Sequence, residues 1–278
     1  MTTFSLSPNH YNYSSQPGTN NLLRFGRDEQ WVETIESALS ENSLSLYLRE
    51  INALATLDTQ RAYDILLFLV TPEGQKIPAE VFYPVAERYN LSQQLNHWMI
   101  DQLVQNLSQA SIQSLQNYRF TIPLSQVNFK DYRWLEIIDS NLTNLGIDKD
   151  VIGFEISEQI ALSDLTATSE LITSLQTLGY RVTLNNCGSQ MTSFSYLQHL
   201  PVDYLKISEQ FVRTMHQDHS DKAIVEMIYY LAQMMGLQTI ATGVDNLDIL
   251  KSVISLGVDY AQGRYLTDLQ LLDFKQLR

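Results

Sequence analysis

Residues 151–184, VIGFEISEQIALSDLTATSELITSLQTLGYRVTL, contain the pattern that decides the fold. Two short apolar runs, Val151–Ile156 and Arg181–Leu184, are typical of buried strands. Between them, apolar residues recur at helical spacing up to Gly179, a typical helix-terminating residue: Leu171, Ile172, Leu175 and Leu178. The stretch therefore predicts a strand, a helix and a second strand in sequence.

The same alternation extends in both directions along the chain. The other strand-like runs are residues 45–48, 63–70, 118–124, 202–207, 238–241 and 258–261, with helical patterns between most of them. Eight strands, most followed by a helix, over about 250 residues predict an α/β fold, a (βα)8 TIM-like barrel. A doubly wound open sheet is the alternative, but no glycine-rich turn follows an early strand.

The composition describes a globular chain with an acidic surface. The 278 residues are 44% hydrophobic and 18% charged, and 31 acidic against 18 basic side chains give a net charge of −13. This charge argues against nucleic acid and anionic membranes as partners. Cys187, the single cysteine, excludes an intramolecular disulfide. No apolar run approaches the roughly 20 residues that span a bilayer, and the first residues do not resemble a signal peptide, so we expect a cytoplasmic protein.

Two regions of different character are predicted. Residues 1–26 are rich in Ser, Asn, Tyr, Thr and Pro and show no apolar period, which predicts a flexible N-terminal segment. An ordered arm docked on the domain is the alternative. Residues 27–278 are predicted to form the barrel domain.

Polar residues follow the predicted strands. In a βα barrel the chemistry lies at the carboxyl ends of the strands, so residues at these exits are expected to share one pocket. The residues at these positions are Pro123, Glu155 with Glu158, Asn185, Asn186, Lys206, Thr242 and Gln262.

Several sequence blocks resemble the EAL domain, a family that hydrolyses the bacterial messenger cyclic di-GMP. They are Ile77-Pro78-Ala79-Glu80, Tyr83-Pro84-Val85-Ala86-Glu87, Phe154-Glu155-Ile156-Ser157-Glu158, Leu200-Pro201-Val202-Asp203-Tyr204-Leu205-Lys206-Ile207 and Asp259-Tyr260-Ala261-Gln262-Gly263. The similarity runs from about Ser43 to Leu266. The resemblance implies an EAL-type barrel whose first strand runs antiparallel to the others.

The chain departs from the family pattern at the residues that the resemblance implies as metal ligands. Active members hold two Mg²⁺ or Mn²⁺ ions, which need oxygen ligands, mainly carboxylates. Glu155 is retained and Asp64 replaces a glutamate, but Pro123 replaces an asparagine, and Asn185 and Asn186 replace two aspartates. We therefore expect Mg²⁺ and Mn²⁺ binding to be lost, leaving no cofactor.

The resemblance also places Thr242 where the family has its general base. A threonine hydroxyl does not accept a proton near neutral pH. Lys206 and Gln262 are retained, as is Glu158, which in the family supports the loop after the paired aspartates. We expect a domain with no catalytic residues that is not an enzyme.

Binding of cyclic di-GMP is a separate question. The phosphate-binding arginine of the family is replaced by Phe68, while Arg49 and Arg264 are candidates to contact the nucleotide from other positions. The negative net charge disfavours a dianionic ligand. We regard cyclic di-GMP as a disfavoured partner.

The leading hypothesis is a degenerate, catalytically inactive EAL-like domain in bacterial signalling that binds another regulatory protein. The alternatives are a metal-independent cyclic di-GMP receptor and a residual cyclic di-GMP phosphodiesterase. Family analogy adds a homodimer as an alternative to a monomer. The sequence does not identify the protein partner.

Overall fold

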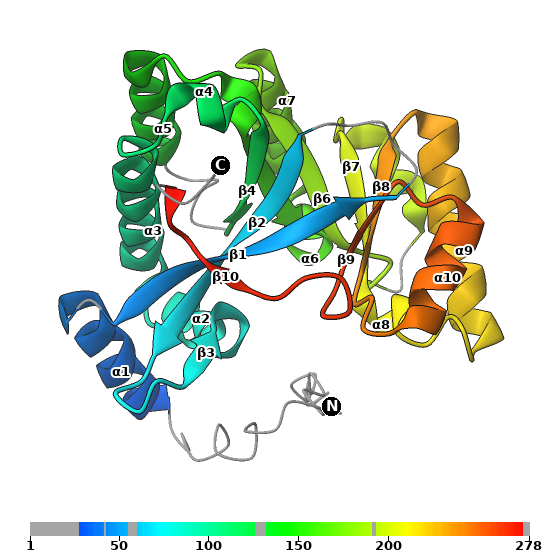
Figure 1. Ribbon diagram of the computed structural model, residues 1–278, viewed down its shortest axis with the longest axis horizontal. Coiled ribbons are helices and arrows are strands. Elements are labelled where there is room, and N and C mark those ends of the chain that lie inside the picture. Colours follow the sequence, from blue (N-terminus) through cyan, green and yellow to red (C-terminus); the bar gives the residue numbers. More distant parts are fainter. Residues whose placement is uncertain (1–27, 42, 55–59, 126–131, 191–192, 275–278) are drawn as a thin grey trace, which may run out of the picture.

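The computed structural model describes residues 28–41, 43–54, 60–125, 132–190 and 193–274. The N-terminal segment predicted to be flexible lies outside these residues, and the predicted domain boundaries stay a prediction. Within the described part, the strands form one sheet that closes on itself, with helices outside it (Figure 1). No helix of the described residues is long and apolar enough to cross a bilayer.

Ten strands are described, and eight of them form the closed barrel. Their order around it is β1-β9-β8-β7-β6-β5-β4-β2, and β2 pairs with β1 to complete the circle. The bounds are β1 Leu44–Ala53, β2 Arg61–Val70, β3 Lys76–Pro78, β4 Tyr118–Leu124, β5 Ile152–Ser157, β6 Arg181–Cys187, β7 Tyr204–Ile207, β8 Gln238–Thr242, β9 Tyr260–Gln262 and β10 Gln270–Leu271. The pairing of β1 with β9 excludes the doubly wound open sheet.

The first strand is antiparallel to both of its barrel neighbours, as the resemblance implied. A short connection joins β1 to β2, so the two strands pair as antiparallel neighbours. The pairs from β2 through β4 to β9 are all parallel. The carboxyl ends of β2 and β4 to β9 therefore meet at one rim of the barrel, where the predicted site lies.

The helices pack outside the barrel. In Figure 1, α3 and α5 lie on one side of it, and α9 and α10 lie on the other. The α-helices are α1 Asp28–Glu41, α2 Ala79–Arg88, α3 Ser92–Leu107, α4 Ile112–Leu115, α5 Arg133–Leu145, α6 Glu158–Ser163, α7 Leu165–Thr177, α8 Glu209–Val212, α9 His219–Met235 and α10 Leu247–Leu256; 3-10 turns cover Lys149–Val151 and Phe194–His199.

Local signals explain where the last two long helices begin and end. The Asp218 carboxylate accepts hydrogen bonds from the first amides of α9, and the Asn246 side chain does the same for α10. Gly236 and Gly257 end the helices with left-handed backbone angles, φ 72° and 91°. The cap at Asp218 starts α9 four residues before the predicted Ala223.

The predicted strands all exist, with shifted bounds, but two short strands were not predicted. The strands β3 and β10 pair antiparallel with β2 and β1 outside the barrel, and each has three residues or fewer. Such short segments give no period-2 pattern that distinguishes them from loops. They widen the sheet where β1 and β2 extend beyond the barrel.

Candidate functional site

A buried charge cluster occupies the carboxyl ends of the barrel strands. The Lys206 ammonium, from β7, donates to Asp64 Oδ2 of β2 at 2.5 Å and also pairs with Glu155 of β5. The side chains of Lys206, Asp64 and Glu155 are only 3%, 8% and 13% exposed. One ammonium thus pairs with two carboxylates that are largely buried.

Two amides complete the cluster. Gln262 Nε2, from β9, donates to Asp64 Oδ2 at 2.7 Å. Asn185 Nδ2, from β6, donates to Glu155 Oε1 at 2.6 Å. These contacts connect side chains from five strands, which are distant in sequence, because the parallel register brings their carboxyl ends to one rim.

The pKa values of Glu155 and Lys206 are shifted because two carboxylates surround one ammonium. Burial raises the pKa of Glu155, and the neighbouring charge of Asp64 raises it further, against the opposing effect of Lys206. Burial alone would lower the pKa of Lys206, but Asp64 and Glu155 together raise it above its ordinary value. Lys206 is therefore an ammonium ion and not a base, and it cannot neutralise both acids.

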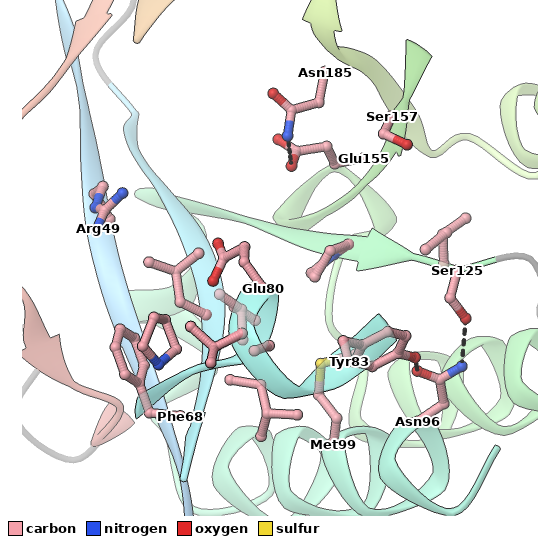
Figure 2. A pocket seen from close by; sticks show the side chains of 18 of the residues that line it. Arg49, Phe68, Glu80, Tyr83, Asn96, Met99, Ser125, Glu155, Ser157 and Asn185 are labelled. Atoms are coloured by element: carbon pink, nitrogen blue, oxygen red, sulfur yellow. Dashed lines mark hydrogen bonds between the residues drawn. The ribbon is translucent and has the colours of Figure 1, made fainter. Parts of the chain in front are cut away.

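A cavity of about 700 Å³ opens beside this cluster. We call it the strand-end cavity; its polar lining includes Arg49, Glu80, Tyr83, Asn96, Ser125, Glu155, Ser157 and Asn185, and Phe68, Met99 and Pro123 line its apolar parts (Figure 2). Glu155 and Asn185 belong to both the cavity and the charge cluster, so they connect the two. Its volume lies within the range of small-molecule sites.

Arg49 is the notable cation of this cavity. It projects from β1, its residue is partly buried, and among the described residues its guanidinium forms no ion pair with a carboxylate. Lys76 also lines the cavity but lies over the ring of Tyr47, 4.3 Å from the centroid. A guanidinium without an acidic partner is ready to bind an anionic group.

The remaining predicted residues lie apart from the cavity. Arg264 pairs with Asp245 at 2.9 Å and is 54% exposed. Thr242 donates to the backbone oxygen of Ile207 at 2.6 Å. Neither residue lines the cavity, although Thr242 is the register partner of Gln262, a member of the charge cluster.

Asn186 and Glu158 serve the segment that follows β6. The pairing of β6 with β7 is shifted here, and Asn186 adopts a left-handed backbone with φ 55°, which asparagine tolerates. The fully buried Glu158 carboxylate accepts hydrogen bonds from the backbone amides of Gly188 and Gln190, at 3.1 and 2.8 Å. It also accepts one from the Tyr196 hydroxyl. Both residues position this segment and neither lines the cavity.

Sequence reasoning missed the wall of the cavity formed by α2 and α3. Tyr83, Asn96 and Ser125 form a hydrogen-bonded row there. One signal was available: Asn96 lies three residues before Met99 on the apolar face of a predicted helix, where an amide is unusual.

Comparison with known proteins identifies the family. Residues 32–268 match the EAL domain, and the chain belongs to this family. It is 31% identical over 234 residues to cyclic di-GMP phosphodiesterase PdeB of Shewanella oneidensis, covering 84% of this chain and 27% of PdeB. It is 28% identical to cyclic di-GMP phosphodiesterase PdeF of Escherichia coli, covering 84% of this chain and 30% of PdeF. The chain thus spans about three tenths of the length of these relatives.

A solved structure shares the fold. The FimX EAL domain from Pseudomonas aeruginosa, bound to cyclic di-GMP, superposes with a TM-score of 0.76 at 24% identity, covering 86% of this chain and 96% of that domain. The EAL-type barrel is thereby confirmed for this EAL domain. Degeneracy of the domain is not shown by these comparisons.

Two expectations from the sequence are contradicted. The expectation that the chain is not an enzyme is wrong by this comparison, because PdeB and PdeF are both named phosphodiesterases. The expectation that no metal cofactor is used is likewise contradicted, because phosphodiesterases of this family depend on Mg²⁺ or Mn²⁺. The judgement that cyclic di-GMP is a disfavoured ligand is also not supported. These expectations relied on substituted positions and gave too little weight to the acids that remain.

Two of the remaining acids offer ligands for a divalent cation, and no third His, Cys, Asp or Glu side chain joins them among the described residues. Asp64 Oδ1 is buried and has no hydrogen-bond partner in the described structure, and Asp64 with Glu155 exceeds Lys206 by one negative charge. Carboxylate oxygens are the ligands that Mg²⁺ and Mn²⁺ prefer. Asp64 and Glu155 would hold the ion, in competition with the Lys206 ammonium. When bound, such an ion activates water and offsets charge on a phosphodiester.

Proposed function

We propose that this domain binds cyclic di-GMP in the strand-end cavity. The observation that carries the proposal is Arg49, a partly buried guanidinium that lines a cavity of about 700 Å³ without a carboxylate partner among the described residues. A phosphate group is a fitting partner, since arginine binds phosphate oxygens through two parallel hydrogen bonds. The similarity to a FimX domain solved with cyclic di-GMP supports this choice of ligand.

The apolar lining suits the rest of such a ligand. Phe68, Met99 and Pro123 offer flat or adaptable surfaces to a nucleobase. Glu80 and Glu87 also line the cavity and oppose a dianion, so Arg49 must carry much of the attraction. Removing its charge is therefore the sharpest test.

The test is a calorimetric titration with cyclic di-GMP, run with and without Mg²⁺. We expect the Arg49→Gln variant to bind about tenfold to a hundredfold more weakly than the wild type, the loss typical of one charge-assisted hydrogen bond. Arg264→Gln is the matched control, because Arg264 is paired with Asp245 and does not line the cavity. Absence of wild-type binding at high micromolar ligand contradicts the proposal, and an equal loss in both variants contradicts the role of Arg49.

Hydrolysis of cyclic di-GMP is a second candidate function. It is favoured by the relatives named as phosphodiesterases and by the two carboxylates that exceed Lys206 in charge. In this case Asp64 and Glu155 would hold the ion, Lys206 would orient both acids, and Arg49 would bind the phosphate.

The activity test is product formation from cyclic di-GMP with Mn²⁺. A Glu155→Gln variant removes one of the two acids and keeps the side-chain shape. We expect activity of the wild type to disappear in this variant and on chelation. Activity unchanged by both treatments points to a contaminating enzyme and contradicts this candidate. Binding of another regulatory protein, homodimer formation and a cytoplasmic location stay predictions.

A further inference from the structure

The helix α2 presents an acidic face to the strand-end cavity. Glu80, Tyr83 and Glu87 lie three and four residues apart, so they share one side of the helix, and all three line the cavity. Figure 2 shows Glu80 and Tyr83 on this side. Among the described residues, neither Glu80 nor Glu87 forms an ion pair with a basic side chain. This face of the cavity therefore suits a basic occupant.

The helix α1 brings the start of the described chain to the same place. It packs against another side of α2, where Trp31 and Phe82 stack with ring centroids 6.4 Å apart. Its first residue, Asp28, pairs with Arg88 at 2.8 Å, and Arg88 directly follows Glu87. The residues that precede Asp28 therefore join α1 beside the end of α2 that carries Glu87.

These preceding residues differ in charge from the rest of the chain. All 31 acidic side chains of the protein lie in residues 28–278. Residues 1–27 contain Arg24 and Arg27 and no acid. The charge of this segment is thus complementary to the acidic face of α2.

The basic part of the segment is within reach of that face. Arg24 precedes Asp28 by four residues, which span at most about 14 Å, and the arginine side chain extends this reach toward Glu87. Leu23 and Phe25 flank Arg24. The segment therefore carries apolar side chains that match the apolar lining of the cavity next to a cation that matches its acids.

We propose that residues 22–27 dock on the acidic face of α2, with Arg24 paired to Glu87 and Phe25 placed in the apolar part of the strand-end cavity. The segment and an anionic ligand then compete for one cavity. Because the segment is tethered, its effective concentration is in the millimolar range, so even a weak contact occupies the cavity for much of the time. The apparent affinity for the ligand falls with the fraction of molecules that remain open. The inference takes its ligand from the proposed function and adds a competitor that belongs to the chain itself.

A paramagnetic label tests the docking without any ligand. A nitroxide on Asn21→Cys in the full chain should broaden the amide signals of α2 around Glu80 and Glu87 at every protein concentration. The native thiol of Cys187 does not take up the label, because it is fully buried. Adding Arg24→Gln should reduce this broadening about twofold, the effect of losing one exposed ion pair.

Three results of the label experiment would overturn the inference. The first is a wild-type spectrum in which α2 is affected no more than α10, which lies on the other side of the barrel (Figure 1). The second is equal broadening with and without Arg24→Gln. The third is broadening that grows with protein concentration, which assigns the contact to a second copy of the chain.

Titration with cyclic di-GMP tests the competition. We expect Arg24→Gln to bind the ligand about twofold to threefold more tightly than the wild type, because the competing segment is weakened. Without docking, loss of a positive charge leaves the affinity for a dianion unchanged or lower, so the sign of the effect is diagnostic. Thr3→Glu is the matched control, since it changes the net charge by the same amount at the far end of the segment.

A second pair of variants leaves the charge unchanged. Phe25→Ser should also tighten cyclic di-GMP binding, whereas Phe4→Ser, the same substitution far from α1, should not. Unchanged affinity in both Arg24→Gln and Phe25→Ser overturns this inference and leaves the proposed function standing. A wild type that does not bind cyclic di-GMP overturns the proposed function, while the label experiment still decides whether the segment docks.

Discussion

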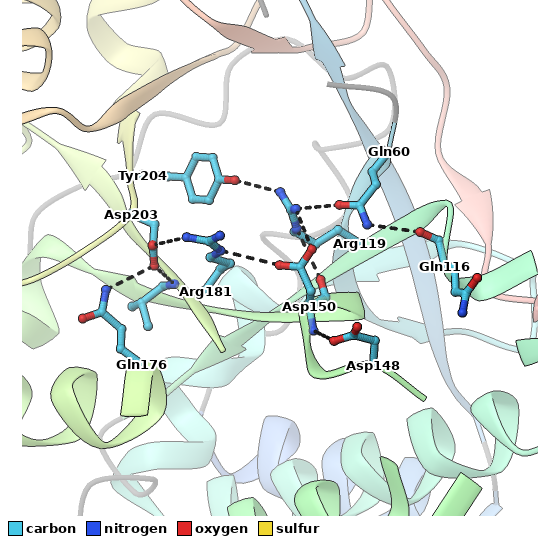
Figure 3. A network of polar contacts seen from close by, with 10 residues as sticks. Gln60, Gln116, Arg119, Asp148, Asp150, Gln176, Arg181, Asp203 and Tyr204 are labelled. Atoms are coloured by element: carbon cyan, nitrogen blue, oxygen red, sulfur yellow. Dashed lines mark hydrogen bonds and ion pairs between the residues drawn. The ribbon is translucent and has the colours of Figure 1, made fainter. Parts of the chain in front are cut away.

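The two ends of the barrel each gather ionic side chains, but with a different balance of charge. At the carboxyl ends of the parallel strands, Lys206 alone serves the buried acids Asp64 and Glu155. At the opposite end, Arg119 and Arg181 face Asp150 and Asp203 (Figure 3). The two arginines there pair with two aspartates, whereas at the carboxyl end Lys206 alone pairs with two acids.

Exposure differs in the same way. The side chains of Arg181 and Asp150 are 51% and 37% exposed, while Lys206 is only 3% exposed. Arg119 and Asp203 are less exposed, at 12% and 17%, so water screens only the outer part of that group, whereas Lys206 and its partners depend on one another. The comparison indicates that Lys206 is the most deeply buried charge of the two groups and depends most on its partners.

The largest expected effect concerns Lys206. Lys206→Met leaves two carboxylates buried without a counter-charge, and we expect the free energy of unfolding to fall by about 3–5 kcal/mol. Urea denaturation monitored by circular dichroism measures this. A loss below about 1 kcal/mol would show that water or an ion already screens the cluster.

The same truncation at the other end should cost far less. Arg181→Met removes ion pairs with Asp150 and Asp203 in which the arginine is 51% exposed, although Asp203 is only 17% exposed, so we expect a change of about 0–1 kcal/mol in the same denaturation experiment. A loss equal to that of Lys206→Met would contradict the contrast between the two ends.

Glu87 gives a smaller effect on ligand binding that depends on pH. Burial raises its pKa above the ordinary 4.5, and it lines the cavity with Arg49, Lys76, Glu80 and Glu155. Its negative charge appears as pH rises through this raised pKa, so the affinity for a dianion should fall over that range. Glu155 contributes in the same direction.

The variant Glu87→Gln measures how much Glu87 contributes to the pH dependence of ligand binding. At neutral pH we expect about twofold tighter binding of cyclic di-GMP, the effect of removing one charge that water screens. The fall in affinity with rising pH should be shallower in this variant. If the affinity depends on pH identically in wild type and variant, Glu87 does not contribute to the pH dependence of binding.

The smallest effect is expected at Cys187, directly after Asn185 and Asn186. The thiol is fully buried, and burial raises its pKa to about 12, so the reactive thiolate is absent near neutral pH. We expect no reaction with a thiol reagent until denaturant unfolds the chain. Rapid labelling of the native protein would show that this rim of the barrel opens.

Much of the architecture was predictable because it depends on local patterns. Strands such as Val151–Ile156 and helix ends such as Gly236 and Gly257 are encoded within a few residues. The short β3 and β10 were not, since they exist only by pairing with β2 and β1. The candidate site was predictable in part, because the carboxyl ends of the parallel strands meet at one rim of the barrel irrespective of the loop conformations.

The sequence by itself determined the succession of strands and helices, the family, and which residues stand at the strand ends. Only the tertiary structure decided that Asp64, Glu155 and Lys206 share one buried cluster, that Arg49 faces a cavity while Arg264 pairs with Asp245, and that Tyr83 and Asn96 form a polar wall. The reason is physical. Periodicity depends on neighbours along the chain, whereas charge balance, burial and hydrogen bonding depend on neighbours in space.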